Sequence, residues 1–216
     1  MDIGYILTVL GVIFVSMTLH EVMHGLVAYW LGDETARLQG RLTLNPMKHI
    51  DPFLTIMLPM LIIVTNALTG VHSPVFGGAK PVPFNPTRIR GEEWGVALMA
   101  ISGPLTNLLI AFISFGLLVA LGGVNSGVLG MIAQTSVVVN LGFFVFNILP
   151  LPPLDGSRVI YALAPDFVRR GMDVVERYGL IFVFMIVMLS GSLLGSYMSG
   201  SINGIIDVFS TIFGVS

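Results

Sequence analysis

A mostly apolar segment of about 29 residues, Ile3 to Leu31, carries three ionisable side chains, His20, Glu21 and His24, in its second half. A helix of that length measures about 43 Å at 1.5 Å per residue, which exceeds the roughly 30 Å hydrocarbon core of a bilayer. The segment therefore predicts a tilted or projecting transmembrane helix. Because ionisable groups at membrane depth are costly and usually functional, these side chains constrain both the fold and the chemistry.

The spacing of these residues is typical of a metal site. Residues four apart share a face of a helix, so His20 and His24 can offer two imidazoles to one ion while Glu21 lies beside it. Ser16 extends the same polar stripe, which is expected to face the protein interior. In zinc hydrolases such a carboxylate takes a proton from water at the metal. A proton relay or a buried polar cluster would explain the same residues, but the metal site is favoured because unpaired His and Glu are costly in lipid.

The composition is that of a multi-pass membrane protein. Of the 216 residues, 55% are hydrophobic and only 10% are charged, and the mean hydropathy is +0.91. A soluble core of this size could not bury so much apolar surface, so membrane lipid is an expected partner. The formal net charge of −2 gives no indication of nucleic-acid binding. The chain has no cysteine, which excludes disulfides, thiolate zinc ligands and cysteine nucleophiles.

Without cysteine, a third metal ligand must be a His, Asp or Glu side chain. The other histidines, His49 and His72, lie in polar connections where a solvated loop histidine is the favoured interpretation. Among the acidic residues, Asp155 stands out because it follows an apolar segment and the proline-rich stretch Pro150 to Pro153. Prolines break regular helix, and irregular backbone at membrane depth must be buried or line a wet cavity. Asp155 is therefore a candidate ligand, although capping of a helix beginning near Ser157 would explain it equally well.

The apolar segments predict an all-α polytopic membrane protein, a single domain over 1–216 built as a helical bundle. The four predicted full spans are about Ile3–Leu31, Glu93–Leu121, Val128–Leu151 and Gly179–Tyr197. Pro52 to Leu68 is shorter, about 17 residues with Pro59 in its middle, which favours a re-entrant or short span. The tail, Ser201 to Ser216, has apolar residues at helical spacing and is expected to lie in the membrane interface.

Two segments in the polar connections have the pattern of short strands. They are Gly40–Leu44 and Lys80–Phe84, and each is followed by Asn-Pro. Pro81 and Pro83 lack N–H groups on the same edge, which favours an edge strand. The two segments are expected to pair as a small β element in the cytoplasmic-side loops. Two unrelated extended loops are an equally good interpretation.

The basic residues predict the topology. All ten fall in three connections: Arg37, Arg41, Lys48; Lys80, Arg88, Arg90; and Arg158, Arg169, Arg170, Arg177. If Pro52–Leu68 is re-entrant, the three connections share one side of the membrane; if it spans fully, they split seven against three. The positive-inside rule favours the re-entrant arrangement, with basic loops and active site towards the cytoplasm. In that arrangement the first and third full spans run parallel, so His20, His24 and Asp155 can meet.

Three motifs occur in order along the chain: His20-Glu21-x-x-His24, Gly103-Pro104-Leu105-Thr106-Asn107, and Asn147 to Gly156. In these motifs the chain resembles the site-2 protease family of intramembrane zinc metalloproteases. The motifs cover the three-helix core of the family, about residues 3–31 and 93–160. No polar stretch is long enough for an appended PDZ or CBS-like domain, so the chain resembles the compact type.

The resemblance implies one Zn²⁺ ion bound by His20, His24 and Asp155, with Glu21 as general base. It also implies that the protein resides in the cell membrane and hydrolyses a peptide bond within or near the transmembrane segments of membrane protein substrates. These expectations are based on the family resemblance. The assignment of Asp155 as a metal ligand relies on the resemblance more than the others do.

Two asparagines match motif positions of the family. Asn147 matches the asparagine that is associated with holding substrate. Asn107 matches a position for which substrate binding and helix–helix hydrogen bonding are both open interpretations.

The alternative function is a membrane zinc-binding protein without peptidase activity, such as a transporter, a sensor or an inactive homologue. A transporter is expected to carry acidic or His residues along several spans. In this chain they concentrate at one depth, and Glu21 is not needed for metal binding alone.

Overall fold

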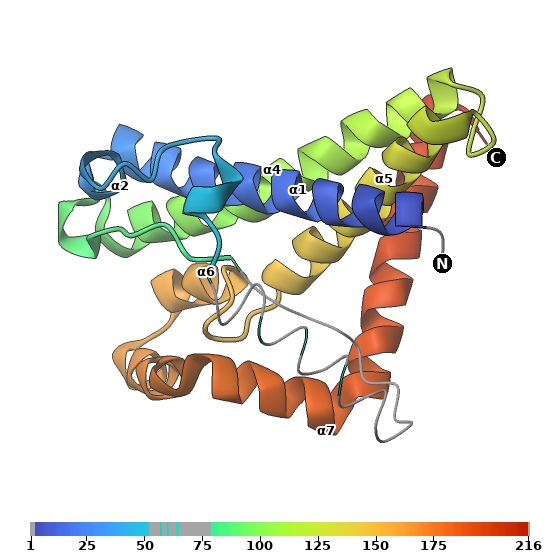
Figure 1. Ribbon diagram of the computed structural model, residues 1–216. Helices are drawn as coiled ribbons and strands as arrows, with labels where there is room; N and C mark the ends of the chain where they lie inside the picture. The colour runs from blue at the N-terminus through green and yellow to red at the C-terminus, as the bar shows by residue number, and fades with distance from the viewer. Residues whose placement is uncertain (1–2, 52–56, 58–59, 61–63, 65–78, 216) are drawn as a thin grey trace.

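The computed structural model describes residues 3–51, 57, 60, 64 and 79–215, and these residues contain no β-strand (Figure 1). The helices are α1 (Ile3–Trp30), α2 (Thr35–Leu38), α4 (Glu92–Ala120), α5 (Gly127–Asn147), α6 (Gly156–Leu163) and α7 (Asp166–Phe213), with short 3₁₀ helices η1 (Pro46–Lys48) and η3 (Pro86–Arg88). The predicted re-entrant segment, Pro52–Leu68, lies outside the described residues apart from positions 57, 60 and 64.

Three of the described helices, α1, α4 and α5, are long and apolar enough to cross a membrane. They correspond to the first three predicted full spans. The fourth, Gly179–Tyr197, lies within α7, and its crossing of the membrane stays a prediction. Exposed leucine and isoleucine side chains repeat along α4 at helical spacing: Leu98, Leu105, Leu109, Ile113 and Leu117. Such a stripe suits contact with lipid tails rather than with water.

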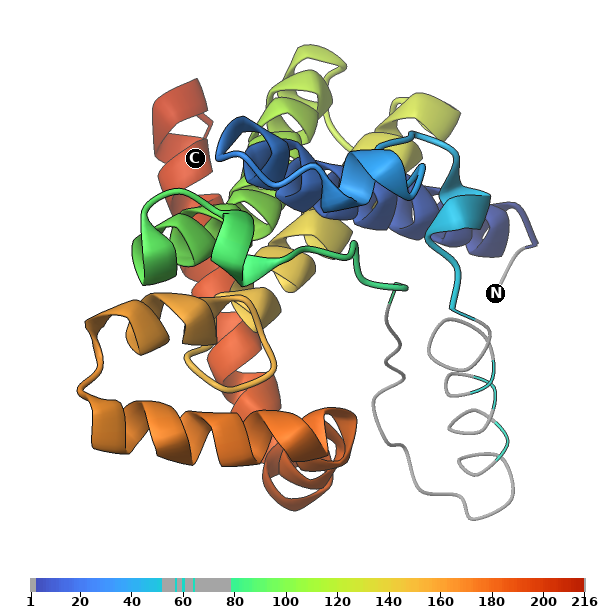
Figure 2. The ribbon, with the colours of Figure 1, turned by 90° about the vertical axis from the view of Figure 1, so that its left-hand side faces the viewer.

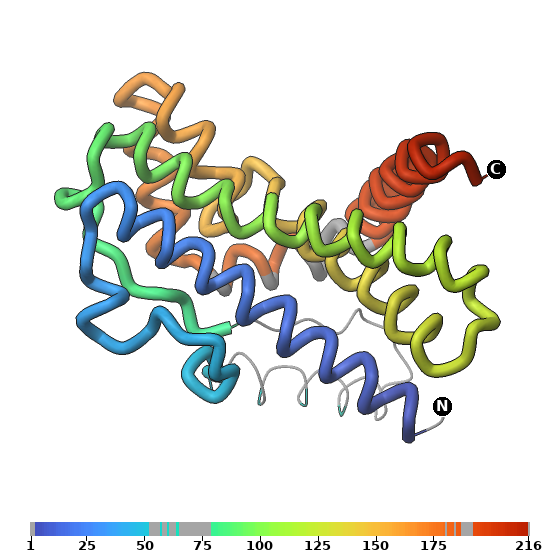
Figure 3. Tube along the Cα trace, turned by 90° about the horizontal axis from the view of Figure 1, so that it is seen from above, coloured from blue at the N-terminus to red at the C-terminus, as the bar shows by residue number. Residues whose placement is uncertain are grey.

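The three candidate spans pack on one another as a bundle. α1 and α5 run in the same direction and α4 runs in the opposite one (Figures 1 and 3), which the expected re-entrant topology requires. Small side chains line their contacts, with Ala28 of α1, Ala100 and Ala111 of α4 and Ala133 of α5 each at most 2% exposed. Small residues let helix backbones approach closely where lipid provides no hydrophobic driving force between helices.

α5 ends at Asn147, four residues before the predicted end of its span at Leu151. The following residues form turns, and α6 begins at Gly156. The prolines in this stretch explain the early end, because each lacks the N–H that a continuing helix needs. α6 packs against α4, and the first part of α7 lies beside α6 (Figure 2). An ion pair between Arg158 and Glu176 joins α6 to α7.

The predicted β element is wrong. Gly40–Leu44 and Lys80–Phe84 are both described, and neither forms a strand. The polar groups of the second segment contact other parts of the chain instead of a strand ladder: the Val82 N–H donates to the Glu21 carboxylate, and Arg41 donates to a backbone carbonyl of the segment. Prolines remove two of the five N–H donors in Lys80–Phe84, and Glu21 takes the Val82 N–H, so the segment has few donors left for a ladder with Gly40–Leu44.

The tail forms the end of α7, and its expected position in the membrane interface stays a prediction. Residues 201–213 continue α7 and pack against α4 and α5, with Phe209 only 6% exposed. The rings of Phe209 and Phe213 lie 5.1–5.8 Å from those of Phe112 and Phe115. A Cβ at Gly116 would lie 2.7 Å from the Phe213 ring, so the glycine provides the space that this ring occupies. Part of the apolar face of the tail therefore packs within the protein.

Asp33, in the connection that follows α1, forms hydrogen bonds that link this connection to the segment before α4. Its side chain is completely buried, with one oxygen accepting from Thr35 N at 3.0 Å and the other from Asn85 N at 2.6 Å. Burial alone would raise the pKa of Asp33, but these hydrogen bonds and the charge of Arg88 lower the pKa below its ordinary value of 3.8. The anchored carboxylate holds Lys80–Phe84 close to the end of α1.

We expect Asp33→Asn to reduce the free energy of unfolding by about 2–3 kcal/mol near neutral pH, because an amide has one acceptor oxygen and charged hydrogen bonds contribute about 1.5–3 kcal/mol each. The measurement is denaturant unfolding in detergent at several pH values. Since the folded state lowers the pKa of Asp33, its contribution is complete above pH 3.8 and is lost as the pH falls through the folded-state pKa. The difference between variant and wild type should shrink in that acidic range.

Glu34→Gln is the matched control. The Glu34 side chain is 53% exposed and its ion pair with Arg37 is 3.7 Å long, so its removal should change stability little. An equal loss from both substitutions, or a loss for Asp33→Asn that does not depend on pH, would contradict the anchoring role.

Candidate metal centre

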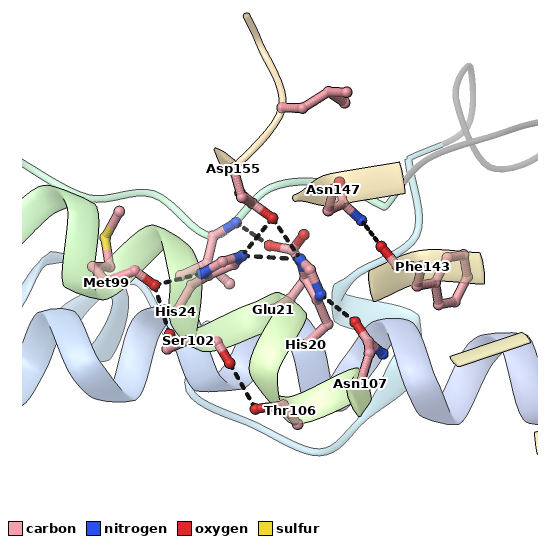
Figure 4. Close-up of polar contacts among 12 residues, drawn as sticks. His20, Glu21, His24, Met99, Ser102, Thr106, Asn107, Phe143, Asn147 and Asp155 are labelled. Atoms are coloured by element: carbon pink, nitrogen blue, oxygen red, sulfur yellow. Dashed lines mark hydrogen bonds and ion pairs between the residues drawn. The ribbon is translucent and has the colours of Figure 1, made fainter. Parts of the chain in front are cut away.

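His20, His24 and Asp155 converge on one point between α1 and the start of α6 (Figure 4). The Asp155 Oδ2 atom lies 3.1 Å from His20 Nε2 and 3.5 Å from His24 Nε2, and the two Nε2 atoms are 2.9 Å apart. Two ligands at about 2.0–2.1 Å from a tetrahedral zinc ion are separated by about 3.4 Å. The observed distances are close to that value, so the three side chains fit a single ion of this kind.

The other ring nitrogen of each histidine has an acceptor on α4. His24 Nδ1 lies 2.8 Å from the Met99 carbonyl oxygen and His20 Nδ1 lies 2.6 Å from Asn107 Oδ1. A backbone carbonyl can only accept, so His24 carries its proton on Nδ1 and directs the Nε2 lone pair at the cluster. Metal-binding histidines usually donate their second N–H to a carbonyl or carboxylate in this way. The chemistry of the donor set therefore agrees with a metal site.

Gly103 of α4 makes room for the two imidazoles. A Cβ at this position would lie 2.5 Å from His24 Cε1 and 2.7 Å from His20 Cε1, distances that real Cβ contacts do not show. The first and second motifs therefore meet in space, because the i, i+4 pair on α1 needs a position without a side chain on α4.

Asp155 reaches the histidines from the turn after α5. It stands at the N-cap position of α6, all of whose residues are described, but its side chain makes no capping hydrogen bond. The carboxylate points at the cluster instead (Figure 4). The turn is tight, since a Cβ at Gly156 would collide with the carbonyl oxygen of Ile148. Of the two interpretations of Asp155, the geometry favours the ligand over the helix cap.

Glu21 lies beside the cluster with its carboxylate fixed by the backbone. Its Oε2 atom accepts a hydrogen bond of 2.8 Å from the N–H of Val82 (Figure 4), a residue that is only 7% exposed. The extended segment Lys80–Phe84 therefore reaches the candidate active site. Holding one oxygen leaves the rest of the carboxylate to face the cluster.

The remaining candidate residues have different surroundings. Asn147, the last residue of α5, donates from Nδ2 to the Phe143 carbonyl oxygen at 3.0 Å and makes no hydrogen bond with the His20–His24–Asp155 cluster within the described part of the chain. His49 was expected to be solvated, but it is 2% exposed and its Nε2 bonds to the Thr43 carbonyl oxygen at 2.9 Å. His72 lies outside the described residues.

Sequence reasoning missed Asn140 of α5. Its side chain is completely buried and bonds to Asn107, which in turn bonds to His20. The available signal was an amide in the middle of an apolar span, where an unpaired polar group is costly. The contacts of the Val82 N–H and the Met99 carbonyl with the site could not be predicted from the sequence, because nearly every residue has the same backbone groups.

Comparison with curated proteins identifies relatives over most of the chain. The chain is 40% identical over 213 residues to a Bacillus subtilis protein named "Putative zinc metalloprotease YwhC", an alignment covering 93% of this chain and 90% of that protein. It is 29% identical over 192 residues to "Putative zinc metalloprotease Rip2" of Mycolicibacterium smegmatis, covering 86% and 68% of the two chains. The Mycobacterium tuberculosis protein of the same name is 27% identical over 205 residues, 95% of this chain and 75% of its own. No family model and no solved structure matches the chain.

Gly103→Ala should weaken zinc binding by about 10- to 100-fold, the range observed when the support of a metal ligand is disturbed. The reason is that the added methyl group displaces both imidazoles. Chelator competition with the purified protein in detergent measures the affinity. Gly142→Ala is the control, because a Cβ at that position of α5 meets no atom within 4 Å. Unchanged affinity in the Gly103 variant would mean that the ion does not use these imidazoles.

Proposed function

The chain belongs to the site-2 protease family of zinc metalloproteases, and from this membership we propose that it hydrolyses peptide bonds within or near the transmembrane segments of membrane proteins. The observation that carries the proposal is the convergence of His20, His24 and Asp155 beside Glu21. These residues lie on or next to helices long and apolar enough to span a membrane.

His20, His24 and Asp155 would hold one zinc ion. When bound, zinc acts as a Lewis acid that polarises a carbonyl group and makes water more acidic. Two neutral imidazoles and one carboxylate are a usual ligand set for catalytic zinc. These ligands come from α1 and from the turn before α6, and Glu21 lies beside them on α1.

Glu21 acts as the general base and then as the general acid. Its carboxylate takes a proton from the attacking water, whose oxygen forms a bond to the scissile carbonyl carbon. When the C–N bond breaks, the same proton goes to the leaving amine. The Val82 N–H supports this role, because it restrains the carboxylate without using its second oxygen.

The substrate segment must be unwound locally, because the hydrogen bonds of a helix shield its peptide bonds. An extended peptide could then lie along Lys80–Phe84 by strand addition, with its own N–H groups donating to backbone carbonyl oxygens of that segment. Asn147 is proposed to help hold this peptide through its side-chain amide. Its position at the end of α5, beside the turn that carries Asp155, supports this assignment (Figure 4).

The proposed setting is the cell membrane, with the basic connections and the active site towards the cytoplasm and with four full spans. The shared direction of α1 and α5 supports this topology. A membrane zinc transporter or sensor is the alternative. It is disfavoured by the position of Glu21, whose side chain binds the Val82 N–H rather than completing the cluster of possible ligands.

Glu21→Gln should retain one zinc ion per chain and lose at least about 100-fold in cleavage rate, since general acid–base catalysis contributes about 10²–10⁴-fold. Zinc content and cleavage of a panel of single-span membrane substrates are measured together in detergent. Glu34→Gln, which changes an exposed carboxylate outside the site, should retain both properties. Zinc binding without cleavage of any substrate by the wild type would favour the transporter or sensor, and absence of zinc after reconstitution would exclude all of these functions.

Asn147→Ala should lower kcat/KM for membrane substrates by about tenfold or more while the zinc affinity stays at the wild-type value, because the side chain makes no hydrogen bond with the described cluster. Steady-state kinetics and chelator competition on the same preparation separate the two effects. An equal fall in zinc affinity would show that Asn147 supports the metal instead of the substrate.

A further inference from the structure

A continuous chain of side-chain hydrogen bonds leads from His20 into the centre of the bundle. Asn107 Oδ1 is 2.6 Å from His20 Nδ1, and Asn107 Nδ2 donates to Asn140 Oδ1 at 2.9 Å. Asn140 Nδ2 in turn donates to Ser16 Oγ and to the Ser136 carbonyl oxygen, both at 2.9 Å. The chain therefore connects α1, α4 and α5 in the core of the candidate spans.

The two asparagines and Ser16 are essentially inaccessible. Asn107 and Asn140 are 0% exposed and Ser16 is 2% exposed. At such a site a flip of the side-chain amide would break its hydrogen bonds, and water cannot replace them. The flip is costly because it would leave buried polar groups unpaired. Each asparagine is consequently held in one orientation by its neighbours.

The contacts of Asn140 determine which atom donates and which accepts in each hydrogen bond from Asn140 to His20. The Ser136 carbonyl oxygen can only accept, so the NH₂ group of Asn140 must face it and Oδ1 must face Asn107. Asn107 must then present its own NH₂ group to that oxygen and turn its Oδ1 towards His20. His20 Nδ1 has to be the protonated nitrogen, which leaves the lone pair on Nε2 for the metal.

We propose that Asn140 is a positioning residue for His20, acting through Asn107 to fix which ring nitrogen of His20 binds the metal. The proposal rests on the proposed zinc site. In this proposal Asn140 does more than hold helices together. A hydrogen bond that only joins two helices would serve equally well with donor and acceptor exchanged. Ser16 is different, because Asn140 keeps its orientation through the Ser136 carbonyl when Ser16 is replaced.

The test compares Asn140→Leu with Asn140→Asp by chelator competition for zinc in detergent. Leucine removes the acceptor that orients Asn107, and the affinity should fall by about 10- to 100-fold, as for other disturbed supports of a ligating histidine. Aspartate keeps an oxygen towards Asn107, and in its protonated form its O–H replaces the amide donor to the Ser136 carbonyl oxygen, so this variant should retain most of the affinity. Ser16→Ala is the matched control and should leave the zinc affinity unchanged. The thermal unfolding of each variant shows whether it is folded.

The double variant Asn107→Asp, Asn140→Leu separates orientation from packing. A carboxylate at 107 accepts from His20 with either oxygen, so it needs no orienting partner. In the Asn107→Asp background, Asn140→Leu should cause no further loss of zinc affinity. An equal loss in both backgrounds would mean that Asn140 acts through packing, and the proposal would be wrong.

The outcomes also separate this proposal from the proposed function. If the wild type binds no zinc, both are wrong. If the wild type binds zinc and Asn140→Leu binds it equally tightly, only the role of Asn140 is wrong. If Asn140→Leu does not fold, the zinc affinities of Asn140→Asp and Ser16→Ala are compared instead. A loss of zinc affinity in the aspartate variant alone would contradict the proposal. Zinc affinity retained in both variants would support it.

Discussion

The need to give every polar group a partner in the centre of a membrane bundle shapes this protein. An imidazole or a carboxylate in such surroundings loses its water and has to find other contacts. His20 and His24 find them on α4 and on Asp155 after α5. The contacts that satisfy these side chains are therefore also contacts that hold α1, α4 and α5 together.

The polar contacts between the helices also require that the helix backbones approach each other closely. Alanines at the contacts between α1, α4 and α5 allow the backbones to come near, and Gly103 removes the one Cβ that would occupy the space of both imidazoles. Lipid supplies no hydrophobic force to press helices together, so such packing and the hydrogen bonds across it have to stabilise the bundle. A change at Gly103 consequently affects the helix contact and the site at once.

Local spacing and hydropathy predicted the parts of this structure that depend on short stretches of sequence. The bounds of α1, α4 and most of α5 follow from apolar runs, and the pairing of His20 with His24 follows from helical periodicity. The β element was wrong because hydrogen bonds to side chains replaced the strand ladder. The apolar spacing of the tail did not reveal that its residues also pack against α4 and α5, because an apolar helical face suits a protein groove as well as a membrane surface.

The contacts around the site fall into two kinds that arise from different parts of the chain. The histidines are supported from the bundle interior, through Asn107 and the Met99 carbonyl, by groups that packing holds in place. Glu21 is supported from the opposite side by a backbone N–H of an extended segment, which Asp33 anchors through Asn85. Metal binding should therefore respond mainly to changes within the helices, whereas the position of the base should respond to changes in the connecting segments. A protease that binds substrate along Lys80–Phe84 would place the general base and the substrate under the control of the same segment.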